Sequence, residues 1–99
     1  MSIQKVGFNA AEYALKHKMG IGSFRLKDGS SVKILQDTDK DIIQFFQVKN
    51  GELLGAKGYH GPNADCNAAN FLCDLEKYAE NVEELEKAWA NSCEFDVMA

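Results

Sequence analysis

The sequence has no long apolar run and few features that mark secretion. No stretch approaches the roughly 20 apolar residues that a membrane helix needs, and residues 1–7 lack the apolar core and cleavage pattern of a signal peptide. The three cysteines, Cys66, Cys73 and Cys93, are an odd number, which is typical of free thiols in a reducing compartment. We therefore expect a cytoplasmic protein with no membrane partner.

Motifs of several enzyme and cofactor classes are missing too. The chain has no P-loop, no GxGxxG after a strand, no GxSxG and no HExxH. Asp37, Asp39 and Asp41 have the first spacings of an EF-hand loop, but Ile42 and Val48 stand where that loop needs Gly and Glu. We therefore predict a non-enzymatic chain without a cofactor or a metal site.

The charge is divided unevenly along the chain. The 99 residues are 45% apolar and 26% charged, which suits one globular domain over 1–99. Residues 1–62 carry nine Lys/Arg against six Asp/Glu, a net charge of +3, whereas residues 63–99 carry two Lys against nine Asp/Glu, a net charge of −7. The pattern predicts a basic sheet beside acidic helices, whose solvated face could also meet a basic partner.

Start signals for helices occur in the first and last thirds of the chain. Asn9 followed by Glu12 forms a capping box for a helix over 10–19, with a predicted buried stripe of Ala11, Leu15 and Met19 and with Ala14 beside it. After the Gly61-Pro62 break, apolar spacing predicts a helix from 64 to about 80.

The end of the chain leaves alternatives open. Asn81 with Glu84 repeats the capping box and predicts a separate last helix, although the apolar spacing also allows one continuous helix over 64–91. Residues 3–8 and 93–98 could each add a short edge strand.

Four strands arranged as two hairpins are predicted between these helices. The first hairpin turns at Asp28-Gly29, with Gly29 in the left-handed region of a three-residue loop. The second turns at Asn50-Gly51 in a type I′ turn, which places Lys49 opposite Glu52 and Val48 opposite Leu53. We predict an α+β fold: a four-stranded antiparallel sheet with the N-terminal helix and the two C-terminal helices packed on one face.

The register of the second hairpin predicts a possible interface. The type I′ turn fixes the register, and both faces of this hairpin are then apolar. The chain then has too few helices to cover both faces. The face that we predict as an interface consists of Ile43, Phe45, Leu54 and Ala56.

The order of elements resembles the double-stranded RNA-binding domain family over residues 9–80. The resemblance rests on Asn50-Gly51, Gly55, Gly58, Gly61 and Ala68-Ala69. It implies a cluster of lysines at the start of the last helix that grips phosphates. Residues 63–67 instead carry one aspartate and no positive charge, so nucleic acid is not the expected partner, and nucleic-acid binding is kept only as an alternative function.

The sequence does not identify an activity, and the function that we expect is protein interaction. The chain would act as a homodimer, or bind a protein partner, through a sheet face and the acidic helices. The alternative is a small-ligand binder or minor thiol enzyme at the loop between His60 and Cys66. Cys66 would lie in the first turn of a helix, where the dipole favours a thiolate, and His60 lies six residues upstream.

Overall fold

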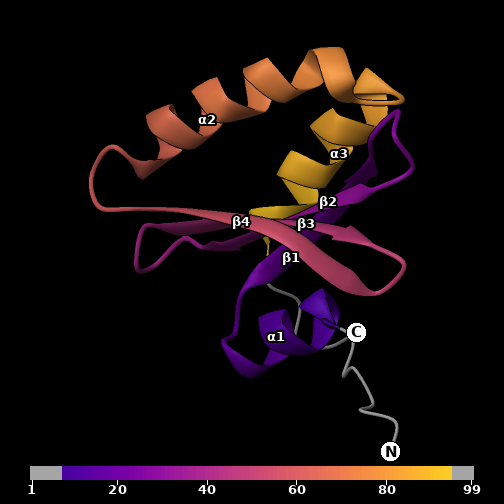
Figure 1. Cartoon of the computed structure of the whole chain (residues 1–99). Helices are drawn as coiled ribbons and strands as arrows, with labels where there is room; N and C mark the ends of the chain where they lie inside the picture. The colour runs from indigo at the N-terminus through magenta and orange to yellow at the C-terminus, as the bar shows by residue number, and fades with distance from the viewer. Residues whose placement is uncertain (1–7, 95–99) are drawn as a thin grey trace, which may run out of the picture.

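The computed structural model describes residues 8–94 and contains one four-stranded antiparallel sheet in the order β1-β2-β3-β4 (Figure 1). The strands are β1 (Gly20–Arg25), β2 (Ser31–Asp37), β3 (Ile42–Lys49) and β4 (Glu52–His60). The helices are α1 (Ala10–Lys16), α2 (Ala64–Leu75), the 3-10 turn η1 (Glu76–Tyr78) and α3 (Val82–Ser92). The predicted α+β fold, with one N-terminal helix and two C-terminal helices around such a sheet, is confirmed.

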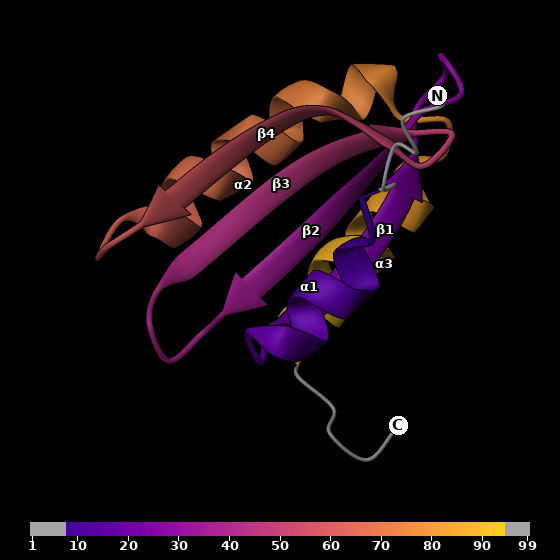
Figure 2. The same cartoon turned by 60° about the horizontal axis from the view of Figure 1, so that its bottom comes forward.

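The helices lie on both faces of the sheet, which corrects the prediction that all three share one face (Figures 1 and 2). The core beneath α2 and α3 includes Ile34. Helix α1 packs on the opposite face, where Ala14 meets Leu35 and Phe46. Because successive residues of a strand point to opposite faces, the buried neighbours Ile34 and Leu35 require a cover on each side.

Helix α1 begins where the capping signal predicts. The side-chain oxygen of Asn9 accepts a hydrogen bond from the Glu12 amide at 3.1 Å. Ala14 and Met19 are buried as predicted, but Leu15 is 65% exposed and Ala10 is buried in place of Ala11. The aromatic residues Phe8 and Tyr13 pack against Phe46 and set which side of the helix faces the sheet.

The last third of the chain forms two helices, so the continuous helix over 64–91 does not occur. Ala79 is extended, with φ −70° and ψ 137°, and separates η1 from α3. The Asn81 side chain then caps α3 by accepting from the Glu83 amide at 2.8 Å and the Glu84 amide at 3.4 Å. The edge strands predicted over 3–8 and 93–98 fall mainly on residues outside those that the structure describes.

The β3–β4 hairpin starts in the predicted register and then slips by one residue. Asn50 and Gly51 have φ 53° and 76°, and Val48 lies opposite Leu53 as expected for a two-residue turn. The next pair is Gln47 with Gly55, which leaves Leu54 as the extra residue of a β-bulge. Beyond Leu54, each residue of β4 therefore faces the side opposite to the predicted one.

Candidate interaction surface along strand β4

The four residues predicted as an interface do not share one surface. Ile43 is 1% exposed and Phe45 is 3% exposed, and both lie in the core beneath α2 and α3. Ala56 is exposed and pairs with Phe46, which places it on the α1 face. Leu54 is 52% exposed at the bulge. The single-residue slip thus divides the predicted patch between the two faces of the sheet.

Strand β4 forms an open edge of the sheet. Seven of its nine residues are exposed, and only Gly55 and Tyr59 are partly shielded. Within residues 8–94, no further segment pairs with its outer side. An edge strand presents backbone N–H and C=O groups that lack strand partners, so β4 is a template on which another strand can pair.

The other edge of the sheet is closed at the end of β1 by the segment that leads into α3. The Arg25 amide donates to Glu84 Oε1 at 2.7 Å, and the Arg25 carbonyl accepts from the Glu80 amide at 2.9 Å. The Lys27 amide donates to the Tyr78 carbonyl at 2.9 Å. Segment 78–84 therefore supplies here the hydrogen bonds that a fifth strand would make.

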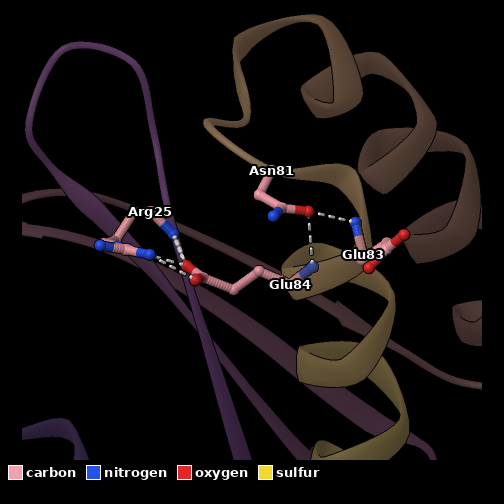
Figure 3. A network of polar contacts seen from close by, with 4 residues as sticks. All are labelled: Arg25, Asn81, Glu83 and Glu84. Carbon is pink, nitrogen blue, oxygen red and sulfur yellow. Dashed lines mark hydrogen bonds and ion pairs between the residues drawn. The ribbon is translucent and has the colours of Figure 1, made fainter.

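The side chains of Arg25 and Glu84 reinforce this closure (Figure 3). Arg25 Nε lies 3.2 Å from Glu84 Oε1, and Arg25 Nη2 lies 2.9 Å from Glu84 Oε2. The hydrogen bond from the Arg25 side chain, followed by that from its amide, lowers the pKa of Glu84. Glu84 was expected to complete a capping box, but its carboxylate binds another element of the fold.

Because Glu84 is ionisable, we expect the stability of the fold to depend on pH. Because the folded state lowers the pKa of Glu84 below its ordinary value of 4.5, folding favours the ionised form. The stabilisation is fully present above that value and is lost as the pH falls through the lower, folded pKa. Glu84→Gln should therefore lower the melting temperature at neutral pH and reduce its decline between about pH 6 and about pH 3.

Thermal denaturation followed by circular dichroism measures this effect. Glu83→Gln is the matched control, because Glu83 also lies in the first turn of α3 but its side chain is exposed. Equal pH profiles for the two variants would show that the contact with Arg25 contributes nothing to stability.

An apolar groove lies on the α2 side of β4. One cavity of about 250 Å³ lies between α2 and strands β3 and β4, and a second cavity of about 310 Å³ adjoins it. Leu26, Gln47 and Leu75 line both cavities. Phe45 and Phe71 add aromatic walls, with ring centroids 4.9 Å apart in an edge-to-face contact. The groove is thus mostly apolar and runs beside an open strand.

Polar groups of the groove are held in defined positions. Gln47 donates from Nε2 to Ser30 Oγ at 3.1 Å, and Ser30 Oγ donates to Asp28 Oδ1 at 2.5 Å. The hydrogen bonds from the Ser30 hydroxyl and amide lower the pKa of Asp28. Lys57 Nζ lies 5.1 Å from the centroid of Phe71 and 5.6 Å from that of Tyr59, within cation–π range.

The residues of the alternative thiol site lie at the far end of β4. His60 ends the strand, Gly61 turns the chain with φ 100°, and Cys66 lies in the first turn of α2. Both side chains are exposed, and no hydrogen bond joins them. The geometry therefore shows no nucleophile and base in contact.

Metal-binding and membrane-spanning features can be assessed over residues 8–94. No three His, Cys, Asp or Glu side chains there are placed to hold a metal ion. Asp37 Oδ1 instead accepts from the amides of Asp39 and Lys40 in the β2–β3 turn. No helix in this range is long and apolar enough to cross a membrane.

The groove residues Gly55, Lys57, Phe71 and Leu75 were not identified from the sequence. Their common location depends on the bulge and on the way α2 lies over β3 and β4, which no local motif indicates. No protein-family model matches the chain, and no curated protein or solved structure matches it.

Proposed function

We propose that the chain is a non-enzymatic protein-interaction domain that binds an extended polypeptide segment along the outer edge of β4. The observation that carries the proposal is the contrast between the two edges of the sheet. Segment 78–84 hydrogen-bonds to the end of β1, whereas no further strand of the described chain pairs with the outer side of residues 53–60 of β4. In strand addition, main-chain hydrogen bonds supply affinity and neighbouring pockets supply specificity.

The composition of β4 supports the proposal. Proteins protect exposed edge strands with proline, with several charged side chains, with β-bulges or with very short strands. The bulge of β4 affects only its start, because residues 55–60 continue in a regular register with β3. Between Leu53 and Tyr59, β4 has one charged residue, Lys57, and no proline. Leu53 is 41% exposed and Leu54 is 52% exposed, so apolar side chains stand at the start of the open edge. The small residues that follow allow another backbone to approach closely.

The acidic residues of α3 belong to a different part of the molecule. Helix α3 packs against β1 and β2, at the other end of the sheet from β4 (Figure 2). The proposed surface therefore combines the β4 edge with the groove beneath α2 and does not include the acidic face of α3.

We expect peptides selected for binding to the immobilised chain to bind more weakly when charged residues are introduced on the β4 edge. The experiment selects binders from a displayed random-peptide library and measures their affinity by fluorescence anisotropy. Leu53→Lys combined with Leu54→Lys should weaken the selected peptides roughly tenfold, because lysine on an edge strand disfavours pairing with a further strand. Amide hydrogen exchange of wild-type β4 should slow in the presence of peptide.

Leu15→Lys is the matched control, because Leu15 is another exposed leucine and lies on α1. Equal losses in both variants, or selection that enriches no peptide above an unrelated immobilised domain, would contradict the proposal. A second copy of the chain is the other polypeptide that could pair with β4. If a second copy pairs with β4, light scattering after size-exclusion chromatography will show a dimer for the wild type and a monomer for the Leu53/Leu54 double variant.

A further inference from the structure

We infer that the groove beside β4 selects an apolar side chain in the bound segment together with a carboxylate two positions away. The inference rests on the proposed function, because it specifies which extended segment the β4 edge accepts. Three observations carry it: the missing side chain at Gly55, the apolar cavity behind it, and the position of Lys57.

Gly55 provides an opening from the edge of the sheet into the groove. It lies opposite Gln47 and lines the cavity of about 250 Å³. A Cβ atom at this position would meet only Gln47 Oε1, at 4.0 Å. Directly opposite residues on neighbouring strands share a face, with Cβ atoms about 5 Å apart. The residue of an added strand that lies opposite Gly55 therefore directs its side chain towards this space.

The walls of the cavity determine what that side chain can be. Phe45, Phe71 and Leu75 supply apolar surface, and the Gln47 side-chain amide is already engaged by Ser30. An apolar cavity of roughly 150 Å³ is large enough for a benzene ring. The space beside Gly55 is larger, so it accommodates leucine, methionine or phenylalanine, and these gain free energy by leaving water.

Lys57 determines the second position of the bound segment. It lies two residues beyond Gly55 and therefore on the same face of β4. Lys57 takes no part in the ion pair between Arg25 and Glu84 that the described residues form. Its ammonium group lies over the rings of Tyr59 and Phe71. The residue of an added strand opposite Lys57 is two positions from the apolar residue, and a carboxylate there meets a positive charge.

The other charges around the groove agree with this assignment. Lys27 and Asp28 line the adjoining cavity. The Asp28 carboxylate already accepts hydrogen bonds from Ser30, and Lys49 Nζ donates to the Asp28 carbonyl. Among the residues that line the two cavities, Lys27 and Lys57 are cations and Asp28 is a carboxylate, so positive charge is in excess.

The test uses the peptides selected on the wild-type chain. We expect enrichment of a large apolar residue two positions from Asp or Glu. Lys57→Glu should weaken these peptides roughly tenfold by placing like charges opposite each other, and selection on this variant should enrich Lys or Arg at the same position. Gly55→Val should weaken peptides with large apolar residues by filling the opening, and selection on it should enrich smaller residues.

Lys40→Glu is the matched control for Lys57→Glu, because Lys40 is another exposed lysine but lies in the β2–β3 turn and lines neither cavity of the groove. Thermal denaturation checks that each variant is folded, and Lys57→Glu tests the charge even if Gly55→Val is unstable. Peptides that depend on Leu53 and Leu54 but show no apolar and acidic preference would overturn this inference and leave the proposed function standing. The absence of any edge-dependent peptide would overturn both.

Discussion

Gly22→Ala is expected to destabilise the fold by about 3 kcal/mol, at the upper end of the cost of overpacking. Strand β1 passes directly beneath α3 at this position, and a Cβ atom on Gly22 would lie 2.5 Å from the Ala88 carbonyl carbon and 2.6 Å from its Cα. These are backbone atoms, so no rotamer change can relieve the overlap. Helix α3 must move away from the sheet, and the contacts of buried Leu85 and Ala88 loosen with it.

Urea denaturation followed by circular dichroism measures this loss. Gly55→Ala is the control, because it adds the same methyl group to a strand glycine whose Cβ position is open. The control should change the free energy of unfolding by less than about 0.5 kcal/mol, as is usual for such surface positions. If Gly22→Ala were as stable as Gly55→Ala, the close packing of α3 on β1 would be wrong.

Phe45→Ala is expected to lower the free energy of unfolding by about 3–5 kcal/mol, the usual cost of truncating a buried phenylalanine. Phe45 is 3% exposed, and its ring lies edge-to-face with Phe71 at 4.9 Å and with Tyr59 at 6.0 Å. The substitution removes the centre of this aromatic cluster and enlarges the cavity beneath α2. Partial collapse of α2 onto the sheet would place the loss at the lower end of the range.

Leu54→Ala is the comparison that tests the register of β4. The uninterrupted ladder predicts Phe45 and Leu54 on the same face, whereas the bulge buries one and leaves the other 52% exposed. We therefore expect Leu54→Ala to stay within about 0.5 kcal/mol of the wild type. If chemical denaturation showed similar losses in the free energy of unfolding for both variants, the register would be uninterrupted and the bulge would be wrong.

Features that depend on neighbouring residues were predictable from the sequence. The caps at Asn9 and Asn81 and the turn at Asn50-Gly51 each require only a few adjacent residues, and all three occur as predicted. Gly29 has φ 90°, as the predicted three-residue loop requires. These positions indicated the order of the helices and strands, while the sequence left open whether residues 64–91 form one helix or two.

Features that depend on distant residues were not predictable in this way. Glu84 matched a local capping box, yet its carboxylate binds Arg25, which is 59 positions away in the chain. Ile34 and Leu35 are neighbours in β2 and both are buried, so α1 must cover the face opposite to α2 and α3. An alternation of polar and apolar residues, which marks a sheet covered on one face, does not indicate this. The bulge at Leu54 lacks a local signal, since the turn before it is regular.

The candidate site was missed for the same reason. The predicted patch included residues of β4, but a shift of one residue exchanged the faces on which Ala56 and Lys57 lie. No sequence pattern singled out Lys57 or Phe71. Only the packing of α2 over β3 and β4 brings them together at the groove.

The closure of β1 has a consequence for synthesis on the ribosome. The four strands pair in chain order, so the sheet can form by successive hairpins once residue 60 has emerged. The segment that binds the end of β1 and the helix that covers Gly22 come later, in residues 78–92. A nascent chain therefore carries two unprotected sheet edges until α3 docks.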